Sequence, residues 1–128
     1  MEPYRVKPPD KGAAEILVAD DHPEITDLIA EVLSEEGFAV RVAHDGASAL
    51  QAIRERCPDL LLLDVAMPKM RGDEVLRYLR SQGHRDLPII LMTADRWPER
   101  YAALGANQLI RKPFDIGRLV QLITMAVM

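Results

Sequence analysis

Polar side chains capable of chemistry follow four of the apolar runs in this sequence. Asp20 and Asp21 follow the first run, and Asp64, Thr93 and Lys112 follow three later ones. Carboxylates gathered in one place repel one another unless a cation lies among them, and an all-oxygen set suits Mg²⁺ or Ca²⁺. A carboxylate can also attack phosphorus to form an aspartyl phosphate, which needs a metal and donor groups beside the transferring oxygens. Lys112 and Thr93 could supply these donor groups, one with an ammonium group and the other with a hydroxyl.

The apolar pattern predicts five strands that alternate with helices. Short apolar runs typical of buried strands occupy residues 16–19, 38–43, 60–63, 87–92 and 109–110. Apolar residues recur at helical spacing over residues 25–33, 50–53, 75–79 and 116–127, with a short helical piece at 99–104. Asp45 and Asp115 precede two of these helices as candidate N-caps. The fold class is therefore α/β, a parallel sheet with helices on both faces.

This fold class explains why the polar residues should meet. In an open parallel sheet, ligands bind outside the carboxyl ends of the strands, which is where all five residues fall. Residues 1–14 carry prolines and little apolar content, so we expect a flexible leader there and one domain over residues 15–128.

Composition argues against several classes of protein. No apolar run exceeds about four residues, far short of the roughly 18 that a membrane span needs. The polar start of the chain carries no signal peptide, so we expect a cytoplasmic protein that is not bound to a membrane. The single cysteine excludes an internal disulfide. The net charge of −4 and the lack of a recognised DNA-binding motif argue against direct binding to nucleic acid.

The charge is divided unevenly along the chain. Residues 1–64 carry a net charge of −8 and residues 65–128 a net charge of +4. This division predicts a localised acidic site and a separate basic surface. We interpret the arginines of the second half as solvated, with a partner-binding patch as the alternative.

Four short motifs resemble those of the receiver domain of two-component response regulators, a flavodoxin-like (βα)₅ family related to the chemotaxis regulators. They follow one another in the expected order over residues 15–127. The motifs are Ile16-Leu17-Val18-Ala19-Asp20-Asp21, Asp64-Val65-Ala66-Met67-Pro68-Lys69-Met70-Arg71-Gly72, Thr93-Ala94 and Lys112-Pro113-Phe114. Each is weak alone, but together they are specific.

The resemblance implies a role for each carboxylate. Asp64 would be the phosphoacceptor, receiving phosphate from a histidine kinase or a phosphotransfer protein. Asp20 and Asp21 would hold Mg²⁺ together with Asp64 and the backbone carbonyl of Ala66, with Asp20 acting through water. The protein would then not be an enzyme in the usual sense, although it could catalyse its own phosphorylation and dephosphorylation.

The resemblance also implies how the signal leaves the site, and here the chain departs from the family. Lys112 would pair with the phosphoryl oxygens, across a cis bond to Pro113, and Thr93 would turn its hydroxyl toward them. Receivers usually place an aromatic residue three positions before the lysine, and its ring moves as the threonine shifts. This chain has Leu109 there. The span from residue 93 to 105 is also short, so we expect a shortened fourth helix.

Several interpretations of function remain open. We expect a single-domain response regulator that signals to a downstream protein, with a dimer possible through the fourth helix, fifth strand and fifth helix. The alternatives are a receiver excised from a hybrid kinase or longer regulator, and a binding module that does not depend on phosphorylation, suggested by Leu109. A phosphatase of the haloacid-dehalogenase type would need a second acid at Ala66.

Overall fold

Helices and strands alternate along the chain as the apolar pattern predicts. The computed structural model describes residues 8–128. The elements are β1 (Glu15–Ala19), α1 (Pro23–Glu35), β2 (Ala39–Ala43), α2 (Gly46–Glu55), β3 (Leu60–Asp64), α3 (Gly72–Ser81), β4 (Ile89–Thr93), the 3₁₀-helix η1 (Pro98–Leu104), β5 (Gln108–Arg111) and α4 (Ile116–Val127). The first seven residues of the predicted leader, residues 1–14, lie outside the described part of the chain. The flexible leader therefore stays a prediction.

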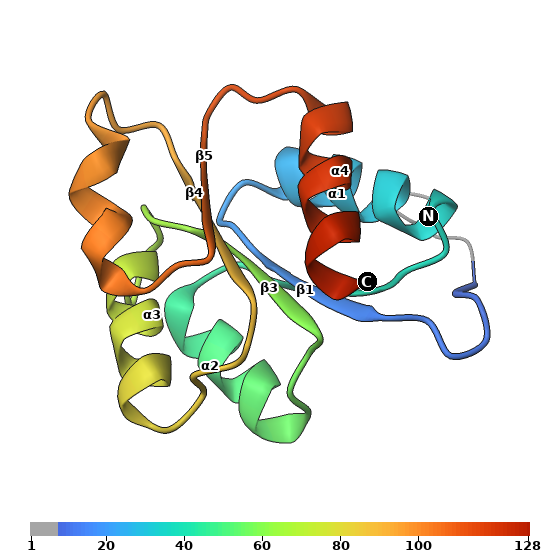
Figure 1. Ribbon diagram of the computed structural model, residues 1–128, viewed down its shortest axis with the longest axis horizontal. Helices are drawn as coiled ribbons and strands as arrows, with labels where there is room; N and C mark the ends of the chain where they lie inside the picture. The colour runs from blue at the N-terminus through green and yellow to red at the C-terminus, as the bar shows by residue number, and fades with distance from the viewer. Residues whose placement is uncertain (1–7) are drawn as a thin grey trace.

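The five strands form one parallel sheet in the order β2-β1-β3-β4-β5. This is the predicted flavodoxin-like receiver fold. The chain passes from β1 outward to β2 and then returns across β1 to β3, so the strand order reverses between β1 and β3 (Figure 1). Such a reversal opens a crevice at the carboxyl edge, which is the usual binding place in open α/β sheets.

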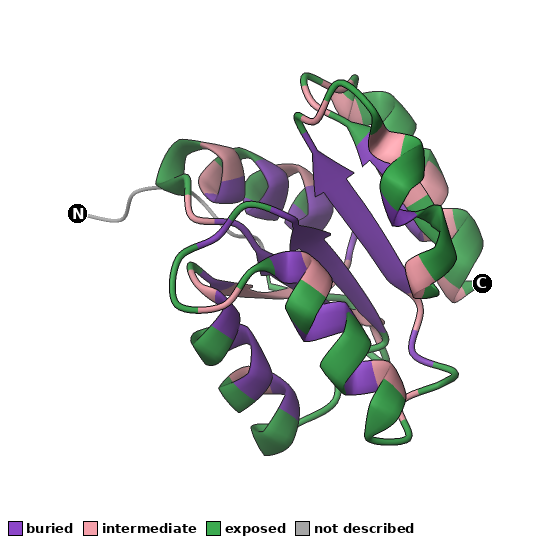
Figure 2. Ribbon diagram, turned by 90° about the vertical axis from the view of Figure 1, so that its left-hand side faces the viewer, coloured by how far each residue is buried: buried purple, intermediate pink, exposed green. Residues whose placement is uncertain are grey.

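Helices cover both faces of the sheet, as predicted. The helices α1 and α4 pack on one face through residues such as Ile29 and Leu119, and α2, α3 and η1 pack on the other through residues such as Leu76 and Tyr101 (Figure 1). The central strands face both layers and are buried throughout (Figure 2). This double burial is why they consist of uninterrupted apolar runs.

The register of the sheet brings strand ends to one edge. Ala19 at the end of β1 pairs with Leu63, so the next residue of each strand is an aspartate. Thr93 at the end of β4 pairs with Arg111, directly before Lys112. The polar residues that follow the apolar runs are therefore neighbours in space.

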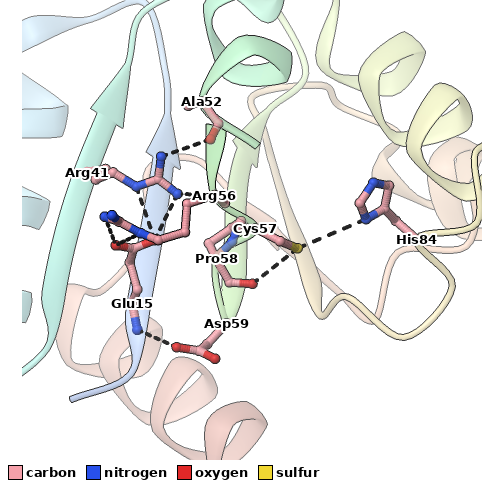
Figure 3. Close-up of polar contacts among 8 residues, drawn as sticks. All are labelled: Glu15, Arg41, Ala52, Arg56, Cys57, Pro58, Asp59 and His84. Atoms are coloured by element: carbon pink, nitrogen blue, oxygen red, sulfur yellow. Dashed lines mark hydrogen bonds and ion pairs between the residues drawn. The ribbon is translucent and has the colours of Figure 1, made fainter. Parts of the chain in front are cut away.

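Charged residues close the opposite edge of the sheet (Figure 3). Glu15 at the start of β1 accepts hydrogen bonds from Arg41 of β2 and from Arg56 after α2. Asp59 accepts from the backbone N–H of Glu15 at 2.7 Å. Burial raises the pKa of Glu15, but the hydrogen bonds and charges of the two arginines outweigh it and hold that pKa below its usual value. The cluster ties two strands and a loop together, far from the candidate site.

The helix after β4, η1, is the shortest of the described helices, and its 3₁₀ form is wound more tightly than an α-helix. Residues 98–104 form a 3₁₀-helix of seven residues, which confirms the predicted shortening of the fourth helix. It ends at Gly105, whose φ of 95° is a left-handed conformation that favours glycine. Within residues 8–128, no helix has the length and apolar character needed to cross a membrane.

Candidate functional site

Three of the predicted site residues make direct contact at the carboxyl edge of the sheet. Lys112 Nζ lies 2.6 Å from Asp20 Oδ2 and 3.3 Å from Asp64 Oδ1. The two carboxylates are almost fully buried, and the lysine side chain is only 13 % exposed. Lys112, the residue directly after β5, thus reaches past the end of β4 to one carboxylate that follows β1 and one that ends β3.

Backbone hydrogen bonds hold these residues in place beyond the strand ends. The N–H of Asp20 donates to the carbonyl oxygen of Ala43 at 3.0 Å, and the N–H of Lys112 donates to that of Thr93 at 2.7 Å. The backbone hydrogen bonding of the sheet therefore continues for one residue beyond β1 and β5. The side chains of Asp20 and Lys112 are oriented by this continuation of the pleated strands.

Gly72 packs directly against the backbone of Asp64. A Cβ at position 72 would lie 2.0 Å from the carbonyl oxygen of Asp64, closer than any real contact. The glycine N–H donates to the carbonyl oxygen of Val65 at 2.8 Å, which draws the start of α3 against the end of β3. Only glycine permits this approach, so the residue fixes the position of Asp64.

A histidine joins the acidic cluster. His22 Nδ1 lies 2.9 Å from Asp20 Oδ1 and 3.1 Å from Asp21 Oδ1. The hydrogen bond with Asp20 and the charge of Asp21 raise the pKa of His22. One ligand atom from each of Asp20, Asp21, His22 and Asp64 lies within 4.8 Å of all the others. The sequence placed His22 beside the acids without indicating this contact, because it depends on the conformation of one side chain.

The electrostatics of Asp64 favour an added cation. Burial, and then the nearby charge of Asp20, raise the pKa of Asp64 to about 6, although Lys112 acts in the opposite direction. Its Oδ2 atom is buried and has no hydrogen-bond partner among the described residues. A buried anionic oxygen of this kind is costly unless a donor or a cation meets it. The donor set, mostly carboxylate oxygens, fits a hard divalent cation such as Mg²⁺.

Thr93 and Ala66 lie at the same edge in different surroundings. Thr93 is 3 % exposed, and its Oγ1 accepts a hydrogen bond from the N–H of Asp95 at 2.9 Å. Ala66 is exposed in the loop after β3. The Lys112–Pro113 bond is cis, as the family resemblance implies.

Sequence reasoning missed Asp95 entirely. Its carboxylate accepts from the N–H of Trp97 at 2.9 Å and from the hydroxyl of Tyr101 at 3.1 Å. The bond from Trp97 is an Asx-turn, in which an aspartate accepts from the N–H two residues further on, and Asp95 before Trp97-Pro98 could have been recognised as a candidate for it. The contact between Asp95 and Tyr101 has no comparable short-range sequence signal, because the two residues are six positions apart.

An apolar groove of about 350 Å³ borders the site. Ile25, Leu28 and Ile29 of α1 form one wall, and Pro113 and Phe114 contribute to the other. Lys112 also lines the groove, so it opens beside the acidic cluster. Leu28 is 53 % exposed, which leaves an apolar side chain of α1 accessible there.

A parallel sheet of order 2-1-3-4-5 with three carboxylates and a lysine at its carboxyl edge defines a class of domain, the receiver. Comparison with known families agrees with this class. The profile of the response regulator receiver domain matches residues 16–124. The chain belongs to this family, which acts in two-component signalling and is not a class of conventional enzymes.

Curated relatives extend the resemblance. The response regulator MprA of Mycobacterium ulcerans is 45% identical over 108 residues, which cover 82% of this chain and 46% of that protein. MprA of Mycobacterium tuberculosis is 44% identical over 108 residues, again 82% of this chain and 46% of the relative. The chain thus spans about half the length of these relatives.

Solved receiver structures superpose closely on the chain. The receiver domain of the Francisella response regulator 1452 has a TM-score of 0.85 at 29% identity and covers 89% of this chain and 96% of its own. The response regulator TrrA of Thermotoga maritima, solved in complex with Mg²⁺ and BeF, has a TM-score of 0.80 at 32% identity and covers 88% and 98%. The acidic cluster is typical of a receiver cation site.

Proposed function

We propose that this protein is a phosphoacceptor that receives a phosphoryl group on Asp64. The observation that supports this most is the buried carboxylate of Asp64, which contacts Lys112 at 3.3 Å and keeps one oxygen without a partner among the described residues. A buried carboxylate oxygen that meets no donor is unusual in a purely structural role, and carboxylate oxygens are competent nucleophiles toward phosphorus.

In the proposed reaction, the Asp64 carboxylate attacks the phosphorus of a phosphohistidine. The new O–P bond forms as the P–N bond breaks, and the imidazole leaves with that electron pair. Lys112 then places its ammonium group against the phosphoryl oxygens, and the Thr93 hydroxyl turns to donate to another. These groups offset the negative charge on the transferring oxygens.

We propose that Asp20, Asp21 and Asp64, with the backbone carbonyl of Ala66, hold a Mg²⁺ ion. When bound, the ion would neutralise the carboxylates and the phosphoryl oxygens. The fit rests on the oxygen donors and on the uncompensated charge at Asp64. His22 Nδ1 lies within hydrogen-bond distance of Asp20 and would orient that carboxylate.

The phosphoryl donor is proposed to be a histidine kinase or a phosphotransfer protein. The apolar groove between α1 and the segment after β5 supports docking of the donor here, because Lys112 lines it and an apolar surface next to a polar centre suits recognition. Signalling to a downstream protein is part of the same proposal, and dimerisation through η1, β5 and α4 is one route for it.

The test uses a small phosphodonor and intact-mass measurement. We expect wild-type protein incubated with acetyl phosphate and Mg²⁺ to gain the mass of one phosphoryl group, and to gain none when a chelator removes the cation. Asp64→Asn should remain unlabelled, while Asp86→Asn, a matched change at an exposed position before β4, should label as the wild type does.

Labelling of Asp64→Asn to the wild-type extent would exclude this proposal. Failure of the wild type to label with acetyl phosphate and with a phosphorylated kinase would instead favour the alternative, a binding module that does not depend on phosphorylation.

A further inference from the structure

The loop between β4 and η1 is organised around the side chain of Asp95. Its Oδ1 accepts from the N–H of Trp97 at 2.9 Å, and its Oδ2 accepts from the hydroxyl of Tyr101 at 3.1 Å and from Arg100 Nη1 at 3.2 Å. The backbone hydrogen bond from Trp97 and the bond from Tyr101 hold the pKa of Asp95 below its usual value. One ionised carboxylate therefore anchors three residues at the start of η1.

The backbone of Asp95 is attached to the phosphorylation site. Its N–H donates to Thr93 Oγ1 at 2.9 Å. The same residue thus touches the threonine hydroxyl through its main chain and the 3₁₀-helix through its carboxylate. The chain of contacts from Thr93 to Tyr101 contains no residue other than Asp95.

Tyr101 supplies the aromatic ring that β5 does not. The ring is 7 % exposed and belongs to the core on the α2 and α3 side of the sheet, against which Leu109 also packs. Leu109 occupies the position where receivers usually carry their aromatic residue. In this chain the buried ring on that face comes from η1, and its hydroxyl is bonded to Asp95.

We propose that Asp95 is a positioning residue that couples Thr93 to η1, so that phosphorylation of Asp64 is read out at Trp97 and Tyr101. This inference rests on the proposed phosphorylation of Asp64. When the Thr93 hydroxyl turns toward a phosphoryl group, the N–H of Asp95 loses its acceptor and the loop must adjust. Because the Asp95 carboxylate holds Tyr101 and the Trp97 backbone, η1 moves with the loop.

Trp97 reports on this coupling directly. It is the single tryptophan of the sequence and its side chain is 61 % exposed, so its fluorescence comes from the β4–η1 loop alone. We expect a change in emission when Mg²⁺ and beryllofluoride are added to wild-type protein. Tyr101→Phe keeps the buried ring and removes only the hydroxyl, and it should lose most of this change. Asp95→Ala should lose it as well.

Two controls separate coupling from structure. Tyr78→Phe removes the hydroxyl of a tyrosine that is 38 % exposed on α3 and should keep the full fluorescence change. Intact mass after acetyl phosphate should show that Tyr101→Phe and Asp95→Ala label to the wild-type extent, and thermal unfolding should show that they are folded.

The outcomes distinguish this inference from the proposed function. Normal labelling with an undiminished fluorescence change in both Tyr101→Phe and Asp95→Ala would overturn the coupling and leave the phosphoacceptor intact. Normal labelling with no change in wild-type fluorescence would do the same. If wild-type protein is not labelled at all, the proposed function fails and the coupling fails with it.

Discussion

At the residue scale, Asp64 carries a conflict between folding and function. Its side chain is almost fully buried on β3, between β1 and β4, and burial together with the charge of Asp20 raises its pKa to about 6. Ionising this carboxyl costs folding free energy, yet the ionised form is the nucleophile that phosphorylation needs. Stability and chemistry therefore favour opposite protonation states of one residue.

We expect Asp64→Asn to raise the free energy of unfolding at pH 8 when no divalent cation is present. The carboxyl has a raised pKa of about 6 in the folded protein against an ordinary value of 3.8. The folded state then holds the proton more tightly, so wild-type stability falls as the pH rises between these two values and is level above them. A shift of about two units corresponds to at most roughly 3 kcal/mol. Urea unfolding at pH 4 and pH 8 measures the effect.

The matched control is Glu31→Gln, which also removes one negative charge but from an exposed position on α1. The Asp64→Asn gain should be large at pH 8 and small at pH 4, and it should exceed that of Glu31→Gln. Equal gains in the two variants, or a gain that persists at pH 4, would show that Asp64 is not destabilising when ionised.

At the scale of elements, Arg80 joins α3 to the segments that precede β4 and β5. Its guanidinium donates to the carbonyl oxygens of Gly105 at 2.9 Å and Leu87 at 2.8 Å, and to Asn107 Oδ1 at 3.0 Å. That same oxygen accepts from the N–H of Ile89 at 2.9 Å. The prediction that the arginines of the second half are solvated is wrong for Arg80, because its side chain fixes the approach to β4 and β5.

We expect Arg80→Met to lower the free energy of unfolding by about 2 kcal/mol, since several carbonyl oxygens lose a charged donor at once. Denaturant unfolding measures this loss. Arg85→Met, on the exposed loop before β4, should cost much less, and both variants should still label with acetyl phosphate because Arg80 lies at the other end of the sheet from Asp64. Equal costs for the two variants would refute this role for Arg80.

Local signals account for the parts of the fold that could be predicted. The predicted caps Asp45 and Asp115 are confirmed, with side chains that accept from the N–H groups of Ser48 and Gly117 at 2.7 and 2.8 Å. Such contacts join residues two or three positions apart, so the sequence carries them directly. The polar residues after the strands were predictable for the same reason, since each ends an apolar run.

The remaining contacts depend on the folded chain. Arg80 meets residues up to 27 positions away, and nothing in the sequence distinguishes it from the solvated arginines. Tyr101 is buried only because the segment after β4 forms a 3₁₀-helix against α3. Periodicity indicated a short helix there but could not indicate which face of it would be covered.

At the scale of the whole molecule, the parallel sheet joins the two differently charged halves of the chain at one point. The acidic half supplies the carboxylates, and the basic half supplies Lys112, which meets Asp20 although the two are 92 positions apart. The uneven division of charge along the sequence thus corresponds to the contact of Lys112 with the carboxylates at the carboxyl edge of the sheet. The site is a product of the complete fold, because β1, β3 and β5 must all be in place to form it.

The most direct test of the account is to locate the phosphorylated residue itself. Borohydride reduces an aspartyl phosphate to homoserine, which tandem mass spectrometry identifies at its position in the sequence. After treatment with acetyl phosphate and Mg²⁺, we expect homoserine at position 64 and an unchanged aspartate at positions 20 and 21. Homoserine at either of those positions instead, or none anywhere in the chain, would contradict the assignment of Asp64 as the phosphoacceptor.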